Sequence, residues 1–406
     1  MKRSAVCLFA LACIVLLFVS FAFAANTIKV GFVDALSGPA GYWGNDELDG
    51  FKMVVNSVNA SGGVLGRKIE YVTRDDKWTP ALSLAMAKEL VMREKVDMLI
   101  GTSGSASALA VSDFAKTEKI PVFVYAKSAK ISGEKGHRYV FAMSENSEMA
   151  GRGAAAVLAK KPYVKYWIAG DDYEFGHTLT ESVWNHLKAL NGKAQLLGQT
   201  WWRMGETDFI PYITAIMSAK PDFLIMGSGG SGIIGFQKAA KATGMNDKIP
   251  FYQHTAIDYT LLAPLGPDGP EGVVGTASYL FYYPQTPENK AFVDEFKKNY
   301  NRYPAMPGFF GYITAQYIVR AYQKAGTFDK EKFIDALEGQ VLEKSPVGNL
   351  ELRACDHQVL FPTYYGVTKK VPEYKDFLIG TDIITVPPKD GAPSCAEIQK
   401  ARAQAK

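Results

Sequence analysis

Short apolar runs alternate with segments of helical periodicity along most of the chain. In the first series, strands are predicted over 28–33, 69–73, 97–101 and 120–124, and helices over 51–58, 81–94 and 107–118. The first of these helices ends at a pair of glycines, which readily terminate helices. Buried strands that alternate with amphipathic helices are typical of parallel β-α-β units. This series therefore predicts one doubly wound α/β unit.

A second series with the same alternation begins after 137–143. Helices are predicted over 149–159, 179–190 and 209–218, and strands over 164–169, 195–200, 222–226 and 250–253. An apolar run over 272–279 then leaves this half, and helices over 289–300 and 309–324 are expected to pack on the first sheet. From Val341 onward the pattern is β-like and rich in Pro and Gly. We therefore expect two Rossmann-like α/β lobes with chain crossings between them.

The first residues have the layout of a secretory leader. Two basic residues precede an apolar run without charged side chains over 5–23, which contains Ala22 and is followed by Ala24. This pattern predicts a signal peptide over 1–24 that is cleaved after Ala24. Because the run approaches the ~20 residues that span a bilayer, a membrane anchor is the alternative. About 380 residues remain after cleavage, more than one core usually serves, which also predicts two domains.

Removal of this leader changes the cysteine count and the charge. Of the four cysteines, Cys7 and Cys13 lie in the leader, so the mature chain keeps Cys355 and Cys395. In an oxidising compartment, two cysteines joined by an irregular stretch are expected to form a disulfide. The leader also carries two basic residues and no acidic one, so the formal net charge falls from +4 to +2. This near-neutral charge gives no basis for nucleic-acid binding.

Two loops at predicted strand ends are candidates for a ligand site. Ligands of open α/β sheets bind beyond the carboxyl ends of the strands, where helix N-termini attract anions. One loop, TSGSAS over 102–107, lies directly before a helix, and the other, AKSAKIS, covers 126–132. The first is either a carboxylate cradle of hydroxyls and backbone amides or an ordinary Ser helix cap. It is not a P-loop, because the G-x-x-x-x-G-K-[ST] spacing is absent.

Signatures of catalysis and metal binding are absent from the mature sequence. It contains no G-x-S-x-G elbow, no H-E-x-x-H and no C-x-x-C. The five histidines are scattered without the spacing of metal ligands. The adjacent Asp171 and Asp172 follow a predicted strand, where a turn and a helix start are expected. We therefore expect neither a cofactor nor a metal.

Four stretches behind the leader resemble one known family. They are IKVGFVDALSGPAGYWG (28–44), VNASGGVLGRKIE (58–70), DDYEFG (171–176) and RACDHQ (353–358). Because of the sequence and the order of these stretches, the chain resembles the type I periplasmic binding proteins of ABC transporters, in the branched-chain amino-acid (leucine/isoleucine/valine) binding family. The resemblance extends from Ile28 to about Lys370, nearly the whole mature chain.

The resemblance implies two α/β lobes joined by three crossing strands, with the ligand in the cleft between them and a hinge that closes it. Lobe one would comprise residues 26–143 and 277–353, and lobe two residues 144–276 and 354–390. Residues 391–406 would form a C-terminal tail that the disulfide ties back to the third crossing.

The resemblance also implies the residues that bind the ligand. Ser105 matches the family serine that holds the ligand carboxylate, helped by backbone amides of the 103–105 stretch. Ser128 matches the hydroxyl residue of the second loop. The other expected contacts are Trp43 from lobe one, Phe175 and Tyr173 from lobe two, and Ser103 and Ala126 from the two loops.

Two departures from the family pattern bear on the ligand. Amino-acid binders pair the ligand's α-ammonium with an acid after the strand that corresponds to 250–253, where this chain has Thr255, with Asp258 three residues later. A buried ammonium without a counter-charge is costly. Lys127 stands where the family usually has a small residue, and in the cleft it would favour an anion; a solvated loop lysine is the alternative. The sequence therefore favours an organic or aromatic acid, whereas a shifted role for Asp258 would restore an amino acid.

These features together predict the substrate-binding component of an ABC importer, and not an enzyme. We expect it in the periplasm as a monomer that delivers a small carboxylate-bearing molecule to a membrane permease. Two other classes stay open. One is a sensor subunit that docks on a membrane receptor. The other is an α/β enzyme that uses His254 with Asp258, or Asp171 with Asp172, as acid and base.

Overall fold

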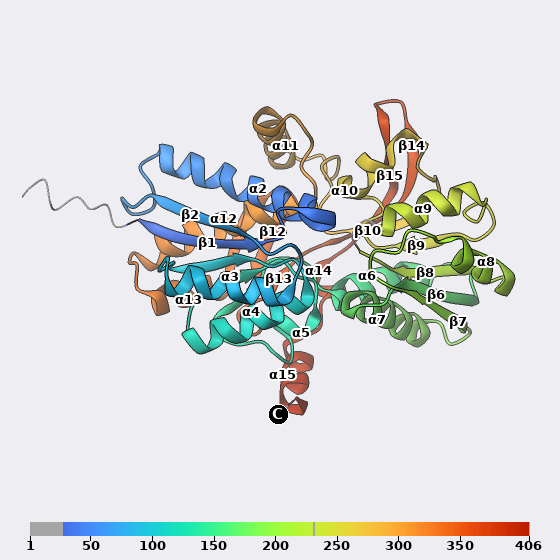
Figure 1. Cartoon of the computed structure of the whole chain (residues 1–406), viewed down its shortest axis with the longest axis horizontal. Coiled ribbons are helices and arrows are strands. Elements are labelled where there is room, and N and C mark those ends of the chain that lie inside the picture. The colour runs from blue at the N-terminus through green and yellow to red at the C-terminus, as the bar shows by residue number, and fades with distance from the viewer. Residues whose placement is uncertain (1–26, 230–231, 406) are drawn as a thin grey trace, which may run out of the picture.

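The computed structural model describes residues 27–229 and 232–405. The expected signal peptide over 1–24 lies outside these residues. Figure 1 shows two lobes side by side, with the blue N-terminal strands in one and the green strands in the other. This architecture confirms the predicted fold of two α/β lobes. Within the described ranges, no helix is both long and apolar enough to cross a bilayer.

The first lobe is built on a five-stranded parallel sheet. Its strands are β1 (Ile28–Asp34), β2 (Ile69–Asp75), β3 (Met98–Gly101), β4 (Val122–Val124) and β5 (Val140–Ala142). Their order is β2-β1-β3-β4-β5, and Val30 of β1 lies opposite Tyr71 and Met98. The helices of this lobe are η1 (Gly38–Ala40), α2 (Gly41–Ala60), α3 (Pro80–Met92), α4 (Ser105–Glu118), α5 (Ala129–Ser132), α11 (Pro287–Tyr300), α12 (Met306–Ala325) and α13 (Lys330–Leu337). Strand β1 is almost wholly buried, as expected for a parallel sheet with helices on its faces.

The second lobe contains a seven-stranded mixed sheet. Its strands are β6 (Lys165–Asp171), β7 (Gln195–Trp202), β8 (Phe223–Gly227), β9 (Phe251–Gln253), β10 (Val274–Ala277), β14 (Thr363–Val371) and β15 (Tyr374–Val386). In the order β15-β14-β10-β9-β8-β6-β7, the pairs that involve β14 are antiparallel and the others are parallel. The helices are α6 (Ser147–Leu158), α7 (Glu174–Leu190), α8 (Ile210–Ala219), α9 (Gly232–Ala242), α10 (Tyr259–Leu265) and η2 (Gly266–Asp268).

The chain passes between the lobes three times, after β5, after β10 and before β14. A small sheet of β11 (Gln340–Ser345), β12 (Gly348–Leu352) and β13 (Val359–Leu360) precedes the third crossing. Residues from 354 onward were expected in the second lobe, but β13 pairs with β12, which precedes the third crossing. A β-like pattern cannot show which sheet a strand joins, since cross-strand pairing decides this. The remaining lobe boundaries stay predictions.

Side chains at the crossings join them to one another. The Gln358 side chain donates to the Ser144 carbonyl at 2.7 Å and accepts from Asn146 Nδ2 at 3.1 Å. It also accepts from Ser132 Oγ at 2.9 Å. Each of these residues is buried, so the bonds are shielded from water. The first and third crossings therefore form one hydrogen-bonded hinge.

Sequence signals explain where several helices begin and end. Prolines at the first or second position begin α3, α8, α11 and α12, where a missing N–H costs no helical hydrogen bond. Helix α12 ends at Gly326 with a φ of 64°, a conformation that glycine adopts without strain. Helical periodicity in the sequence did not predict α5, α9, α10 or α13. Glycines interrupt the apolar pattern of α9, and the other three are short.

Helices α2 and α12 pack closely through glycines. A Cβ on Gly50 would lie 1.8 Å from the Gly308 carbonyl oxygen, and one on Gly311 would lie 1.8 Å from that of Glu47. Only glycine permits such an approach of two backbones. This contact holds the N-terminal half of α2 firmly against the core of the first lobe, and with it Trp43 and Glu47.

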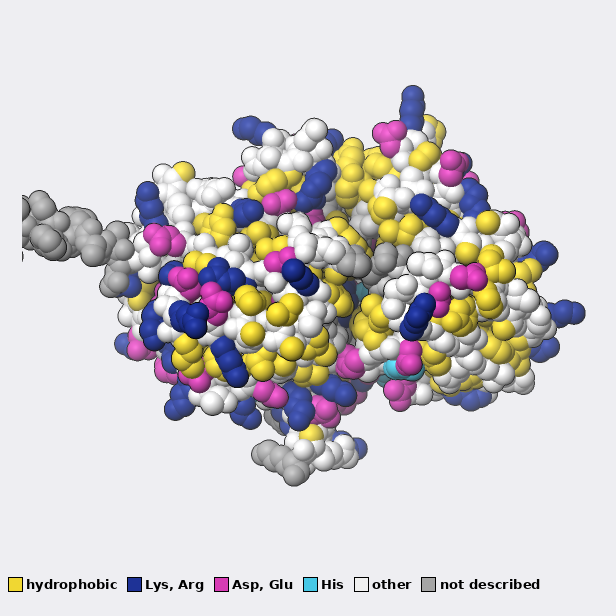
Figure 2. All heavy atoms as spheres, in the orientation of Figure 1, with side chains coloured by type: hydrophobic (Ala, Val, Ile, Leu, Met, Phe, Trp, Pro, Cys, Tyr) yellow, Lys and Arg dark blue, Asp and Glu magenta, His cyan; other side chains and the backbone are white. Residues whose placement is uncertain are grey.

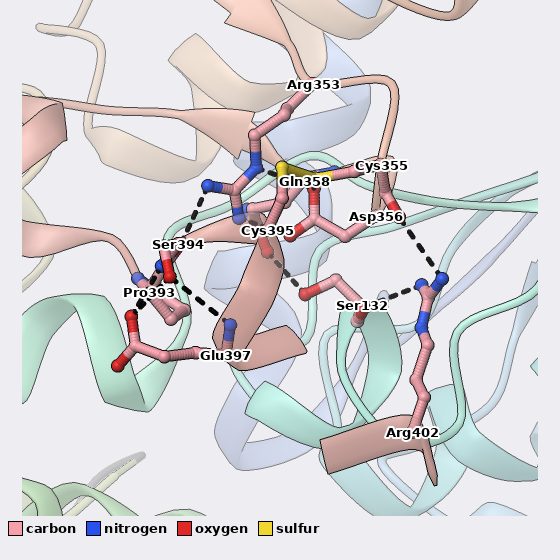
Figure 3. The surroundings of a disulfide bond; sticks show 10 residues. All are labelled: Ser132, Arg353, Cys355, Asp356, Gln358, Pro393, Ser394, Cys395, Glu397 and Arg402. Carbon is pink, nitrogen blue, oxygen red and sulfur yellow. Dashed lines mark hydrogen bonds and ion pairs between the residues drawn. A yellow bond between two sulfur atoms is a disulfide. The ribbon is translucent and has the colours of Figure 1, made fainter. Parts of the chain in front are cut away.

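The C-terminal segment returns to the hinge through the disulfide. It contains α14 (Pro388–Gly391) and α15 (Cys395–Gln404). The predicted bond between Cys355 and Cys395 is confirmed. Figure 3 shows Arg402 beyond it, donating to the carbonyls of Ser132 and Cys355 at 2.9 and 3.2 Å. Glu397 pairs with Arg152 of α6 at 2.7 Å, so the tail contacts both lobes.

Candidate functional site

A cavity lies between the lobes. Its empty space is about 580 Å³, part of it open to solvent. Figure 2 shows the boundary between the lobes as a groove on this face of the molecule. The first lobe contributes Ala40, Trp43, Trp78, Ser103, Ser105, Tyr125 and Lys127 to the walls, and the second contributes Tyr173, Phe175, Ser228, Gly229, Ile233, His254 and Thr255.

Most of these residues come directly after strands. Ser103 and Ser105 follow β3, Tyr125 and Lys127 follow β4, Ser228 and Gly229 follow β8, and His254 and Thr255 follow β9. Because parallel strands end at the same edge of their sheet, loops that are distant in sequence meet there. Open α/β sheets bind ligands at this edge. The cavity therefore occupies the position where both sheets would hold a ligand.

The Ser103 hydroxyl is held by two buried carboxyl groups. Ser103 Oγ lies 2.9 Å from Asp34 Oδ2 and 2.8 Å from Glu47 Oε1, and the Ser103 amide donates to Asp34 at 3.1 Å. Burial raises the pKa of Asp34 to about 6, against the opposing hydrogen bonds with Glu47 and Ser103. Burial and the Asp34 charge raise the pKa of Glu47 well above its usual range. Burial therefore favours the protonated form of these carboxyl groups, and the Ser103 hydroxyl lies within hydrogen-bond distance of both.

Ser105 is the first residue of α4 and faces the cavity. The first N–H groups of a helix have no acceptor within it. The residue at the N-cap of α4 is Gly104, which has no side chain to accept from them. The helix is 14 residues long, so its N-terminus carries a partial positive charge. The Ser105 hydroxyl and this helix start are together suited to hold a carboxylate.

Lys127 lines the cavity but already has an anionic partner. Its Nζ contacts Glu145 Oε1, and both side chains are nearly buried, with exposures of 11% and 3%. His254 Nε2 lies 3.2 Å from the same oxygen, and Ser278 Oγ donates to Glu145 Oε2 at 2.6 Å. Burial would raise the pKa of Glu145, but the Lys127 ammonium and these hydrogen bonds outweigh it and hold the pKa at about 2. Glu145 is therefore ionised and balances the Lys127 charge.

His254 is neutral in this network. Burial lowers its pKa and the Lys127 ammonium lowers it further, against the opposing effect of Glu145. Its Nδ1 lies 3.0 Å from Thr276 Oγ1. If Thr276 donates to Nδ1, Nε2–H can donate to Glu145. The ring lies 5.8 Å from that of Phe175, so the second lobe presents a mainly aromatic and uncharged wall.

The structure brings most of the predicted site residues together. Those that line the cavity are Trp43, Ser103, Ser105, Lys127, Tyr173, Phe175 and Thr255. Ala126 and Ser128 are buried beside it and are not among the lining residues. Ser128 instead donates to Glu174 Oε1 of α7 at 2.8 Å, which joins the two lobes. Contact of Ala126 and Ser128 with a ligand stays a prediction.

Asp258 also lies away from the cavity walls. It caps α10, where its carboxylate accepts from the Thr260 amide at 3.0 Å and from the Met306 amide at 3.0 Å. Burial raises its pKa to about 6, against these hydrogen bonds. The carboxylate that could have paired with a ligand ammonium is therefore engaged within the fold.

Sequence reasoning missed several residues of the walls. They are Ala40, Trp78, Tyr125, Ser228, Gly229 and Ile233, and His254 had been considered only as a catalytic group. Ser228 and Gly229 directly follow a strand that was predicted, so the strand-end rule could have found them. Ile233 lies on α9, a helix that the periodicity did not reveal.

The residues considered as acid and base have structural partners. Asp171 accepts from Trp202 Nε1 and from the Gly229 amide, both at 2.9 Å. Asp172 pairs with His177 at 2.7 Å on the surface. Within residues 27–229 and 232–405, no group of three or more His, Cys, Asp or Glu side chains is arranged to hold a metal ion.

Comparison with known proteins places the chain among binding proteins. A family model described as "Periplasmic binding protein" matches residues 27–370. The chain is 26% identical over 338 residues to a leucine-, isoleucine-, valine-, threonine- and alanine-binding protein of Pseudomonas aeruginosa, which covers 82% of this chain and 87% of that protein.

Solved structures give a similar result. A solute-binding protein of an ABC transporter from R. palustris, in complex with 4-hydroxybenzoate, has a TM-score of 0.81 at 26% identity and covers 89% of this chain and 97% of its own. An amino acid ABC transporter substrate-binding protein from Pseudomonas fluorescens Pf-5 has a TM-score of 0.82 at 22% identity and covers 92% and 98%.

Proposed function

The chain belongs to the periplasmic binding protein family, and on this premise we propose that it is the periplasmic solute-binding component of an ABC importer whose ligand is an aromatic carboxylate. The two lobes close over the ligand by motion at the hinge, and a membrane permease receives it. The relatives are substrate-binding proteins of such transporters, which supports this role.

The charge of the cavity wall carries the choice of ligand. Among the described residues that line the cavity, none is acidic, and Lys127 is the charged one. A carboxylate would find the Ser105 hydroxyl and the start of α4. An α-ammonium would lose its hydration without gaining a counter-charge, which is costly. An acid without an amine therefore fits the wall better than an amino acid does.

The aromatic side chains of the walls favour a ring. Trp43, Trp78 and Tyr125 come from the first lobe, and Tyr173 and Phe175 from the second. Aromatic rings pack favourably against one another in stacked or edge-to-face arrangements. Closure would therefore enclose a ligand ring between aromatic side chains of both lobes. The similar R. palustris protein was solved with 4-hydroxybenzoate, which supports this class of ligand.

A branched-chain or other amino acid is the second candidate. The observation that favours it is the 26% identity to a protein named for binding leucine, isoleucine, valine, threonine and alanine. This candidate needs an acceptor for the ammonium other than a lining carboxylate. Backbone carbonyls or hydroxyls would have to supply it.

Thermal-shift screening of the mature protein tests the proposal. The protein is unfolded and refolded to remove any carried ligand, then mixed with benzoate, 4-hydroxybenzoate, leucine or valine. A ligand that binds only the folded state raises the Tm. We expect the aromatic acids to raise it and the amino acids to leave it unchanged. Stabilisation by leucine or valine alone would overturn the choice of ligand.

A further inference from the structure

The Lys127–Glu145 pair lies where the lobes and the crossings meet. Lys127 belongs to the first lobe, after β4, and Glu145 lies in the first crossing. His254 follows β9 of the second lobe, and Ser278 follows β10 in the second crossing. Glu145 accepts hydrogen bonds from Lys127 and Ser278, and its Oε1 lies 3.2 Å from His254 Nε2. The pair is thus fixed from both lobes, and its Lys127 lines the cavity.

Only one member of the Lys127–Glu145 pair lines the cavity. Lys127 lines it, with its Nζ 5.7 Å from the centre of the Trp43 ring. Glu145 is not among the lining residues, and its side chain, which contacts the ammonium, is only 3% exposed. A ligand therefore meets a cation whose charge is already balanced. Removal of Glu145 would leave Lys127 as an uncompensated positive charge in a site of low polarity.

Charge balance then limits the ligand. One carboxylate can be held at the start of α4, as proposed above. A second carboxylate would be buried against the Lys127–Glu145 pair, whose net charge is zero. It would lose its hydration without gaining a counter-charge. We infer that Glu145 sets the charge of the ligand: by neutralising Lys127, it restricts the site to monoanions and excludes dicarboxylates. This inference rests on the proposed function and assigns Glu145 as a positioning residue that acts through Lys127.

A purely structural role for the pair makes a different prediction. If Glu145 only stabilised the hinge, its substitution would weaken every ligand by a similar factor. If it sets the ligand charge, substitution changes the ratio of affinities for monoanions and dianions. Glu145→Gln keeps the shape of the side chain. Its amide oxygen can take the place of Oε1 beside His254, and its NH2 group can donate to the Ser278 hydroxyl in the place of Oε2. The ratio is therefore the decisive quantity.

Calorimetric titration of the refolded mature protein measures this ratio. The probes are benzoate and the three benzenedicarboxylates, which place the second carboxylate ortho, meta or para. We expect wild type to bind benzoate at least about tenfold more tightly than any dicarboxylate, and Glu145→Gln to shift the ratio by about tenfold or more toward a dicarboxylate. Ser278→Ala, which keeps both charges, leaves the ratio unchanged. The double variant Lys127→Met with Glu145→Gln returns the ratio toward wild type.

Each outcome bears on the inference. An unchanged ratio in folded Glu145→Gln, or a wild-type protein that binds a dicarboxylate as tightly as benzoate, overturns it. If Glu145→Gln does not fold, Lys127→Gln serves instead: the unpaired Glu145 should weaken benzoate by about tenfold more than neutral benzamide. Equal weakening overturns the inference.

The proposed ligand class can be wrong while the inferred role of Glu145 is right. If wild type binds leucine and not benzoate, the proposed aromatic acid is wrong, and leucine and glutamate replace the probes. The inference then predicts that Glu145→Gln gains affinity for glutamate relative to leucine, and no gain overturns it. A wild-type protein that binds none of these probes overturns both.

Discussion

The strand ends that face each other across the cavity share one construction but present different chemistry. In the first lobe, Asp34 ends β1 and holds the amide and hydroxyl of Ser103, after β3. In the second lobe, Asp171 ends β6 and holds the Ser228 hydroxyl and the Gly229 amide, after β8. In each case a buried carboxylate fixes the loop that follows the neighbouring strand.

The difference lies in what surrounds each carboxylate. Asp34 has a second carboxyl group, that of Glu47, beside it. The Ser103 loop that Asp34 holds leads directly into α4, whose start has no side-chain cap. Asp171 accepts instead from the indole of the buried Trp202, and the nearby walls are aromatic. The first lobe therefore offers a polar anchor and the second an apolar cover. Each lobe has an aspartate at the corresponding strand end, and the residues around that aspartate give the two lobes different roles.

The largest expected effect concerns stability. Asp171→Ala leaves the buried Trp202 and Ser228 donors without their acceptor and should cost about 2–6 kcal/mol, because each buried unpaired donor costs about 1–3 kcal/mol. Asp34→Ala should cost about 2 kcal/mol, because the buried Ala35 amide loses its acceptor while Glu47 can still accept from the Ser103 hydroxyl. Urea unfolding at pH 7 measures both. A greater loss for Asp34→Ala would break the comparison.

The next effect concerns affinity. Ser105→Ala should weaken benzoate by about 10–100-fold, the worth of a hydrogen bond to a charged group. Ser228→Ala should weaken it by no more than about threefold, because the Ser228 hydroxyl already donates to Asp171. Calorimetry checks both, with the exposed Ser57→Ala as a control. If Ser228→Ala proved the more damaging, the second lobe would hold the anchor.

The smallest effect concerns pH. The pKa of Asp34 rises from 3.8 to about 6 on folding, so the folded state binds more protons between these values and stability falls as pH rises through that window. The unfolding free energy of wild type relative to Asp34→Asn should fall by about 1 kcal/mol from pH 5 to 6. Burial also raises the pKa of Asp171, but hydrogen bonds from Ser228, Gly229 and Trp202 oppose the rise, so Asp171→Asn should reveal a smaller dependence. Urea unfolding across this range tests both, and an equal or opposite slope would contradict the comparison.

Local sequence patterns were sufficient for one part of the site. The loops that contain Ser103, Ser105 and Lys127 were found because they directly follow strands of a parallel sheet, whose carboxyl ends must share an edge. The individual residues were singled out by comparison with the family pattern. The aromatic Trp43 and Phe175 came from resemblance to a family. The disulfide followed from the two cysteines that remain after the leader is removed.

Other parts depend on tertiary packing that no local pattern encodes. Glu145 in the first crossing meets Lys127 of the first lobe and His254 of the second only because the two lobes meet there. These partners lie 18 and 109 residues away along the chain. Asp258 was considered as the partner of a ligand's α-ammonium because it follows the strand predicted over 250–253 by a few residues. Its position before a helix start was an equally local signal of an N-cap, and the structure places it there.

The contrast between a polar anchor and an apolar cover is tested most directly by one matched pair of ligands. Leucine and 4-methylpentanoate share their carbon skeleton and carboxylate and differ only in the α-ammonium. Calorimetric titration of the refolded mature protein compares them without any substitution in the protein. We expect 4-methylpentanoate to bind more tightly than leucine, because the described cavity wall offers an ammonium no carboxylate. Tight binding of leucine with no binding of 4-methylpentanoate would contradict the account.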